Sequence, residues 1–296
     1  MRLEYTVDSA NSGKTVKQIL KTRLELSERL IKKLKYAGKI LCNSEPIRIN
    51  SPVHAGDLIE AVVDFTEECE DILPQPIEID IVYEDDCLVV IDKQPGIVVH
   101  PTFGHPDNTI ANALAYHLQK KGEMKKIRPV SRLDRDTSGI IIFAKNQFVQ
   151  EQLIRQMEQD IFKKEYIGIA YGIMENPKGT INLPIDRKPG SIMLRHVTED
   201  GSPSVTHYEV MEYLNGATFL RFFLETGRTH QIRVHCQAIG HALVGDTLYP
   251  PFDQSACSTA PVPPIQRQAL HSQKVTFIHP FTNLPMSLSV PIPGDI

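Results

Sequence analysis

The sequence lacks tryptophan altogether, and its five cysteines lie far apart among 296 residues. No CxxC pair occurs and the eleven histidines include no HExxH, so the spacings typical of zinc sites are missing. We therefore interpret the cysteines as reduced thiols and expect no metal. No apolar run approaches the roughly 18 residues of a membrane span. Charge also interrupts the first residues before a signal-peptide core could form, which predicts a cytoplasmic protein without a membrane partner.

The motifs that bind nucleotide phosphates are absent as well. Neither GxGxxG nor GxxxxGK[ST] follows a strand-like segment, and the GxSxG of serine hydrolases is missing. The sequence thus predicts no cofactor. At about 100 to 200 residues per domain, the length predicts one large domain or two unequal ones. Without a coiled-coil pattern or a large apolar stripe, we expect a monomer with no obligate protein partner.

Charge is strongly segregated along the chain. Residues 13–50 contain ten Lys or Arg and only three acids, whereas residues 56–92 contain thirteen acids and no Lys or Arg. A compact cation favours a polyanionic partner such as RNA or DNA, because neutralised phosphates release their counterions. A solvated helix face carrying lysines explains the same charges, and charge alone leaves both interpretations open.

The N-terminal pattern predicts two helices followed by short strands. Val16, Ile19 and Leu20 have helical spacing within residues 13–23, and Ser27 can cap a second helix that ends at Gly38. Strands are expected at residues 40–43, 47–49 and 58–63. These elements predict a basic αβ domain over residues 1–63.

This domain resembles the small RNA-binding domain named after ribosomal protein S-four. The resemblance rests on LKYAGKI at residues 34–40, Asn43 shortly after, and GDLI at residues 56–59. It implies RNA contacts from the lysines of the module, namely Lys14, Lys32, Lys33 and Lys35. An ordinary basic αβ domain is the alternative. The acidic residues 64–76, which contain two prolines, are interpreted as a linker.

Residues 77–296 predict a larger α+β domain, with a mostly antiparallel or mixed sheet flanked by helices. Two hairpins are expected, over residues 79–92 and, around Asn215 and Gly216, over residues 205–224. The other expected elements are a helix capped by Asn108, strands at 128–131, 140–144 and 164–171, a helix at 148–157, and a helix from His230 or Gln231 to Gly240.

The loop RLDRDTSG at residues 132–139 is unusually polar for a segment between two strands. Turn chemistry explains its later residues without any function, since Asp, Thr and Ser hydrogen-bond to nearby backbone and Gly permits a sharp turn. The loop alone therefore does not identify an active site.

The same loop resembles the signature of the RluA-type pseudouridine synthases, and four further blocks match that family in order. They are KQPGIVVHP at 93–101, KEY at 164–166, TGRTHQIRVH at 226–235 and GHALVGDTLY at 240–249. Ser131 departs from the histidine of many relatives, and Gln94 separates Lys93 from Pro95. These departures bear on substrate choice more than on activity.

The resemblance implies isomerisation of uridine to pseudouridine in structured RNA. It assigns the catalytic carboxylate to Asp134, the salt-bridge partner of that carboxylate to Arg233, and the aromatic ring on the uracil to Tyr166. A carboxylate is suited to attack ribose carbon 1′ or to stabilise charge there, because it is ionised at neutral pH. Without the resemblance, Arg233 would be a surface cation and Tyr166 a core aromatic.

Two further arginines are expected to contact RNA. Arg132 resembles the family residue that occupies the space vacated by an extruded base, and Arg228 lies in a matching block. Four other residues of the matching blocks have no specific role, and we expect loop scaffolding or RNA contacts of them: Lys93, His100, His230 and Gln231.

The predicted substrate is ribosomal RNA, most of all that of the large subunit, while transfer RNA stays open. Two alternatives remain: a noncatalytic RNA-binding ribosome-assembly factor that retains the fold, and a hydrolase of N-glycosidic bonds.

Overall fold

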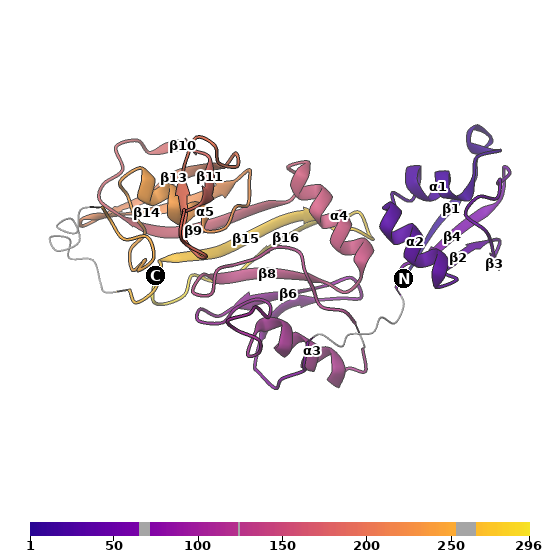
Figure 1. Ribbon diagram of the computed structural model, residues 1–296, viewed down its shortest axis with the longest axis horizontal. Helices are drawn as coiled ribbons and strands as arrows, with labels where there is room; N and C mark the ends of the chain where they lie inside the picture. The colour runs from indigo at the N-terminus through magenta and orange to yellow at the C-terminus, as the bar shows by residue number, and fades with distance from the viewer. Residues whose placement is uncertain (65–71, 124, 253–264) are drawn as a thin grey trace.

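The computed structural model describes residues 1–64, 72–123, 125–252 and 265–296 (Figure 1). Most of the predicted acidic linker, along with Cys69 and Cys257, lies outside these residues. No helix in the described ranges is long and apolar enough to cross a membrane. The fold is α+β, as the sequence predicts, with a large mixed sheet and five α-helices among the described residues.

The N-terminal sheet has four antiparallel strands in the order β1-β4-β2-β3. Its strands are β1 (Arg2–Thr6), β2 (Ile40–Cys42), β3 (Glu45–Pro46) and β4 (Leu58–Val62). The short 3-10 helix η1 (Ser9–Asn11) precedes the α-helices α1 (Val16–Thr22) and α2 (Glu28–Tyr36). Thr15 begins α1 with a capping box and Ser27 caps α2 by accepting the N–H of Leu30. Both predicted helices are confirmed.

The strand predicted at residues 47–49 is wrong. Asn43 and Ser44 both have positive φ, 51° and 69°, and form a two-residue turn in which Cys42 pairs with Glu45. The strand after the turn therefore comes at Glu45–Pro46, and the last backbone bond to β2 runs from the N–H of Ile47 to the carbonyl of Ile40 at 3.3 Å. Strand β1 was not predicted, because its side chains alternate between exposed and half-buried and include two charges.

The large sheet has ten strands, eight of them in the order β10-β13-β14-β9-β15-β8-β6-β5. From the N-terminal side these are β5 (Asp80–Glu84), β6 (Leu88–Lys93), β8 (Ser138–Ala144), β9 (Lys163–Tyr171), β10 (Lys178–Asn182), β13 (Val205–Leu214), β14 (Ala217–Leu224) and β15 (Leu270–Ile278). At its sides β7 (Arg128–Pro129) pairs with β8 and β16 (Pro285–Ser289) pairs with β15. Only β8 and β15 pair in parallel among the described strands, so the sheet is mixed.

Three helices and one small hairpin complete this part of the molecule. The helices are α3 (Ile110–Lys120), α4 (Gln147–Glu158) and α5 (Gln231–Ala238), and the hairpin consists of β11 (Ile185–Arg187) and β12 (Arg195–Val197). Figure 1 shows α3 beside β6 and β8, and α5 near β13 and β14. The centre of the sheet thus brings together the loop before β8, strand β9 and helix α5, which carry Asp134, Tyr166 and Arg233.

Two sequence predictions in this region need correction. Thr109, not Asn108, caps α3, because its hydroxyl accepts the N–H of Asn112 and the Asn112 side chain returns a capping-box bond. Asn108 takes φ 55° one residue earlier. The strand predicted at 128–131 is shorter, Arg128–Pro129. The edge position tolerates a proline without N–H, and the last backbone bond to β8 runs from the N–H of Val130 to the Ile142 carbonyl at 2.8 Å.

The N-terminal part is docked on α4 (Figure 1). Nη1 of Arg155 lies 2.5 Å from Oε2 of Glu25, and its Nη2 donates to the Glu25 carbonyl at 3.1 Å. The Ser27 hydroxyl donates to Glu151 at 2.9 Å. One contiguous apolar core includes Leu30 on α2 and Leu153 on α4. The described residues of the two sheets therefore share a core as well as polar contacts.

Candidate active site

The polar loop 132–139 enters the large sheet at a point where only glycine fits. Gly139 has φ +105°, and a Cβ built there would lie 2.2 Å from the carbonyl oxygen of Ser272 on β15. Because any side chain would overlap this backbone, glycine allows β8 to lie directly against β15. The end of the loop is thereby fixed at the centre of the sheet.

The buried ammonium of Lys93 ties the other side of the loop to the segment after β6. Its Nζ donates to the carbonyls of Gln94 at 2.8 Å, Ile97 at 3.0 Å and Arg135 at 2.8 Å. Burial lowers the pKa of Lys93 to about 7, while the carboxylates of Asp136 and Asp134 favour the charged form. Lys93 therefore holds the backbone one residue beyond Asp134, which gives this unassigned motif residue a structural role.

Asp134 is joined to Arg233, which lies 99 residues away on α5. Nη1 of the guanidinium donates to Oδ2 of Asp134 at 2.8 Å. The remaining edge binds Asp246, with Nε 2.6 Å from Oδ2 and Nη2 2.8 Å from Oδ1. Burial disfavours the charged guanidinium, but the two carboxylates outweigh it and raise the pKa of Arg233. The arginine is thus a buried, permanently charged bridge between two aspartates.

His230 and Tyr249 close the same corner of the site. His230 takes a left-handed conformation, φ 59°, immediately before α5. Its Nε2 lies 3.8 Å from Oδ1 of Asp134, and its Nδ1 is 2.8 Å from the Tyr249 hydroxyl. Burial lowers the pKa of His230, although Asp134 opposes this shift. The Tyr249 ring covers the guanidinium of Arg233, 5.1 Å from its Cζ.

Tyr166 on β9 faces the same small hollow as Asp134. The hollow has a volume of about 60 Å³ and opens into a cleft of about 500 Å³, and both residues line both spaces. The outer volume is within the range of small-molecule sites. Tyr166 is buried, and burial raises the pKa of its phenol above the ordinary value, with the charge of Asp134 adding to the shift. Its hydroxyl therefore keeps its proton at neutral pH.

The two arginines predicted to contact RNA lie at the mouth of this cleft. Arg132 and Arg228 are exposed and line both spaces. Nη2 of Arg132 reaches the Thr229 hydroxyl at 3.5 Å, and Nε of Arg228 donates to the Pro203 carbonyl at 3.3 Å. Lys164 also lines the cleft, and burial lowers its pKa to about 8. Three cationic side chains therefore surround the entrance to the pocket of Asp134.

The predicted RNA-binding lysines of the N-terminal part are not at the cleft. Lys32 and Lys35 on α2 line a separate surface hollow of about 490 Å³, together with Arg29. Lys14 donates to Oδ1 of Asn11 at 2.7 Å, and Lys33 is half-buried. The structure thus separates the lysines of α2 from the pocket and leaves Lys32 and Lys35 exposed.

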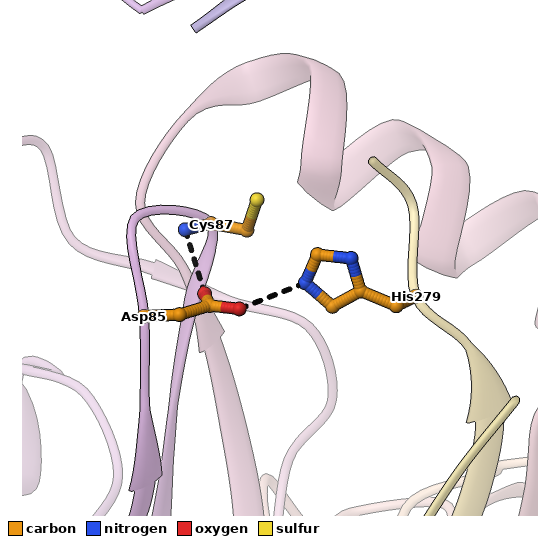
Figure 2. A group of neighbouring side chains, drawn as sticks. All are labelled: Asp85, Cys87 and His279. Atoms are coloured by element: carbon orange, nitrogen blue, oxygen red, sulfur yellow. Dashed lines mark hydrogen bonds and ion pairs between the residues drawn. The ribbon is translucent and has the colours of Figure 1, made fainter. Parts of the chain in front are cut away.

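One group of side chains among the described residues has the composition of a metal site: Asp85, Cys87 and His279 (Figure 2). Figure 2 shows the carboxylate between the backbone N–H of Cys87 and the imidazole of His279. Burial raises the pKa of the Cys87 thiol to about 12. The thiol therefore keeps its proton at neutral pH, whereas a metal ligand would be the thiolate.

The hydrogen bonds of Asp85 also oppose metal binding. Its Oδ1 accepts the N–H groups of Cys87 and Leu88, at 2.7 and 2.9 Å. Its Oδ2 accepts the Tyr83 hydroxyl at 2.8 Å and lies 2.9 Å from Nε2 of His279. The other ring nitrogen of this histidine accepts two backbone N–H groups of the following turn. The group therefore fastens the β5–β6 turn to the segment after β15.

Sequence reasoning gave no specific role to three residues that shape the site. Loop scaffolding or RNA contacts were expected of Lys93 and His230, and nothing was expected of Asp246. All three lie in blocks that the sequence analysis noted. Gly245 offers a signal for Asp246, because it has φ +73° and a Cβ there would lie 2.1 Å from the Arg267 carbonyl. A glycine directly before an aspartate can indicate a tight backbone position that orients the carboxylate. That the carboxylate of Asp246 binds Arg233 is shown only by the fold.

Comparison with known proteins agrees with this site. Residues 87–238 match the family model described as RNA pseudouridylate synthase, and residues 3–59 match the RluD ribosomal pseudouridine synthase N-terminal domain. An uncharacterized RNA pseudouridine synthase of Bacillus subtilis (strain 168), YjbO, is 40% identical over 92% of this chain and 94% of its own. The ribosomal large subunit pseudouridine synthase D of Escherichia coli (strain K12) is 35% identical over 100% of this chain and 92% of its own.

A solved structure supports the same relationship. Human RNA Pseudouridylate Synthase Domain Containing 1 superposes with a TM-score of 0.57 at 25% identity, covering 72% of this chain and 83% of its own. The chain therefore belongs to the RNA pseudouridylate synthase family, whose members isomerise uridine in RNA to pseudouridine.

Proposed function

We propose that Asp134 is the catalytic carboxylate of this isomerisation. The reaction breaks the bond between ribose carbon 1′ and uracil nitrogen 1, turns the base, and joins carbon 1′ to carbon 5. The supporting observation is the hollow itself: Asp134, held by Arg233, and Tyr166 line one small space at the base of the cleft. The ion pair holds the carboxylate in one orientation at the base of the cleft. An assembly factor without activity would have no need of this arrangement.

Tyr166 supplies the aromatic wall of the pocket in this proposal. Its ring offers a stacking surface for the uracil. Because burial raises its pKa, the phenol is a proton donor rather than an acceptor at neutral pH. We therefore assign Tyr166 to holding the detached base, so that it can turn without leaving the hollow.

The uridine must leave the RNA stack to reach Asp134, which costs a few kcal/mol of stacking and pairing. Arg132 stands two residues before Asp134 at the open cleft, where it can replace the extruded base or bind its phosphate. Arg228 is placed to contact the neighbouring backbone.

The proposed substrate is ribosomal RNA of the large subunit, which places the activity in the cytoplasm. Two comparisons support this. Residues 3–59 match the RluD ribosomal pseudouridine synthase N-terminal domain, and the E. coli relative is by name a ribosomal large subunit pseudouridine synthase. We propose that residues 1–63 form a domain that anchors the RNA through Lys32, Lys35 and their neighbours. Residues 64–76 would be the linker, and residues 77–296 would form the catalytic domain. Transfer RNA is the second candidate substrate.

Tritium at uracil carbon 5 tests the activity directly. The wild-type protein should release tritium from labelled large-subunit RNA without releasing free base, because carbon 5 loses its proton when it bonds to the sugar. The Asp134→Ala variant should release none. Asp186→Ala, which removes an exposed aspartate on β11, should behave as wild type. RNA binding without tritium release by the wild type would favour an assembly factor, and free uracil would favour a hydrolase.

A further inference from the structure

Asp246 is a fully buried charged group behind the site, and its side chain binds both Arg233 and the backbone of the segment that follows it. Its side chain has 0% exposure. Its two oxygens grip Nε and Nη2 of Arg233, and Oδ1 also accepts the N–H groups of Leu248 and Tyr249, both at 3.0 Å. The backbone bonds fix the carboxylate, and the bidentate pair then fixes the plane of the guanidinium.

This bidentate salt bridge determines which part of the Arg233 guanidinium faces Asp134. A guanidinium has a limited number of N–H directions in one plane. Asp246 takes Nε–H and one N–H of Nη2, so Asp134 meets the opposite end of the guanidinium, where Nη1 donates to Oδ2 alone. Oδ1 of Asp134 lies 3.8 Å from Nε2 of His230, beyond hydrogen-bond distance. One oxygen of Asp134 is therefore held while the other is left for the substrate.

The arrangement also sets the charge of the site. Asp134, Arg233 and Asp246 together carry one net negative charge, because a single cation lies between two carboxylates. If Asp246 were absent, the fork of Arg233 would be free to turn both of its ends onto Asp134. That pairing would neutralise the carboxylate and occupy the oxygen that must meet carbon 1′.

We propose that Asp246 is a positioning residue for the isomerisation, an inference that rests on the proposed role of Asp134. It acts through Arg233, fixing the guanidinium in the orientation in which Nη1 donates to one oxygen of the catalytic carboxylate. It touches neither the cleft nor the substrate, since it lines neither space at the site.

The test compares Asp246→Asn with wild type in the tritium-release assay. The asparagine oxygen can still accept the two backbone N–H groups and Nη2 of Arg233, whereas its amide nitrogen cannot accept from Nε. We expect kcat to fall by about 100-fold, the scale of a misplaced reacting group, with KM for the RNA changed less than about threefold. A loss confined to KM, or a kcat equal to that of wild type, would overturn the inference.

A double-mutant cycle separates positioning from mere stability. Lysine cannot form the bidentate pair, so in an Arg233→Lys background the Asp246→Asn change should lower kcat by less than about threefold further. Fully additive losses would show that Asp246 does not act through Arg233. This comparison holds even if each variant is less stable, because kcat is taken per folded molecule, measured by circular dichroism.

Asp295 offers a matched control. It forms the same bidentate geometry with Arg267, Nε to Oδ2 at 2.7 Å and Nη2 to Oδ1 at 2.8 Å, but it is 49% exposed. Asp295→Asn should leave kcat within about twofold of wild type. Equal losses in both variants would overturn the inference. A wild-type protein that releases no tritium would remove the proposed function as well, whereas active wild type with an unimpaired Asp246→Asn would remove this inference alone.

Discussion

Lys93 is a charged side chain with 0% exposure whose amine has three backbone acceptors. A buried lysine is rare unless it is paired, and here the partners are carbonyls from two separate loops. One of them, Arg135, directly follows the catalytic candidate. On folding, the amine of Lys93 loses its water, and the three carbonyls replace that water as acceptors. These hydrogen bonds hold the two loops at a fixed distance.

Replacing this side chain should loosen the catalytic loop. In Lys93→Met, the carbonyls of Gln94 and Ile97 lose this donor while that of Arg135 keeps the N–H of Gly96, and a buried unsatisfied polar group costs about 1 to 3 kcal/mol. We expect the free energy of unfolding to fall by about 2 to 4 kcal/mol in urea titrations, and kcat per folded molecule to fall at least tenfold, or about 1.4 kcal/mol. Lys178→Met, at an exposed end of β10, is the control. Unchanged activity would mean that Asp134 is placed without Lys93.

The residues of the site differ in how far the sequence could predict them. The family motifs pointed to Asp134, Tyr166 and Arg233, and the structure places all three around one hollow. Their chemistry still needed the fold, because Asp134 and Arg233 are 99 residues apart. The bidentate grip of Asp246 could not be predicted, since it depends on which edge of a guanidinium faces which loop.

At the scale of elements, Glu84 joins three parts of the large sheet. It ends β5 and accepts from His117 and Lys121 near the end of α3, each at 2.8 Å. Lys145, just after β8, donates to it at 2.8 Å as well. Burial opposes ionisation of the carboxylate, but the hydrogen bonds of Lys121, Lys145 and His117 outweigh it and lower the pKa of Glu84 to about 2.

This carboxylate should stabilise the fold in a pH-dependent way. The folded-state pKa lies below the unfolded value of about 4.3, so its contribution is complete above that value and disappears as the pH falls toward 2. Glu84→Gln should therefore lower the free energy of unfolding by about 2 to 3 kcal/mol at pH 7. The difference from wild type, measured by urea unfolding, should shrink between pH 4.5 and 2. A difference that is constant with pH would contradict this account.

The elements were predictable where periodicity or a turn marks them. Ser27, Asn215 and Gly216 signal a helix start and a hairpin that the structure contains. Strands β15 and β16 carry no such signal, yet β15 lies at the centre of the large sheet and forms its parallel pair with β8. That pairing joins residues more than 130 positions apart, and local pattern does not encode partners at this separation.

At the scale of the whole molecule, the N-terminal part is docked against α4 and shares its core with the large sheet. The basic helix α2 and the cleft therefore belong to one continuous body, within the described residues. An RNA bound in the cleft can contact the lysines of α2 as well only if it is long enough to reach from the cleft to that helix. Short substrates should depend on the cleft alone, whereas long structured RNA should depend on both surfaces.

This arrangement predicts a specific salt dependence. Lys32→Ala/Lys35→Ala should weaken binding of a long ribosomal RNA fragment and lower the slope of log K against log salt by about 1 to 2, because each lost phosphate contact accounts for about 0.7 to 0.9. The chemical step on a short stem-loop should be unchanged. The control is Lys120→Ala/Lys178→Ala, which removes two exposed lysines of α3 and β10 with the same change in net charge. Filter binding from low to high salt would measure the affinity and the salt slope of each double variant. If the two double variants lowered the slope equally, the RNA would be responding to net charge, and the N-terminal part would not be an anchor.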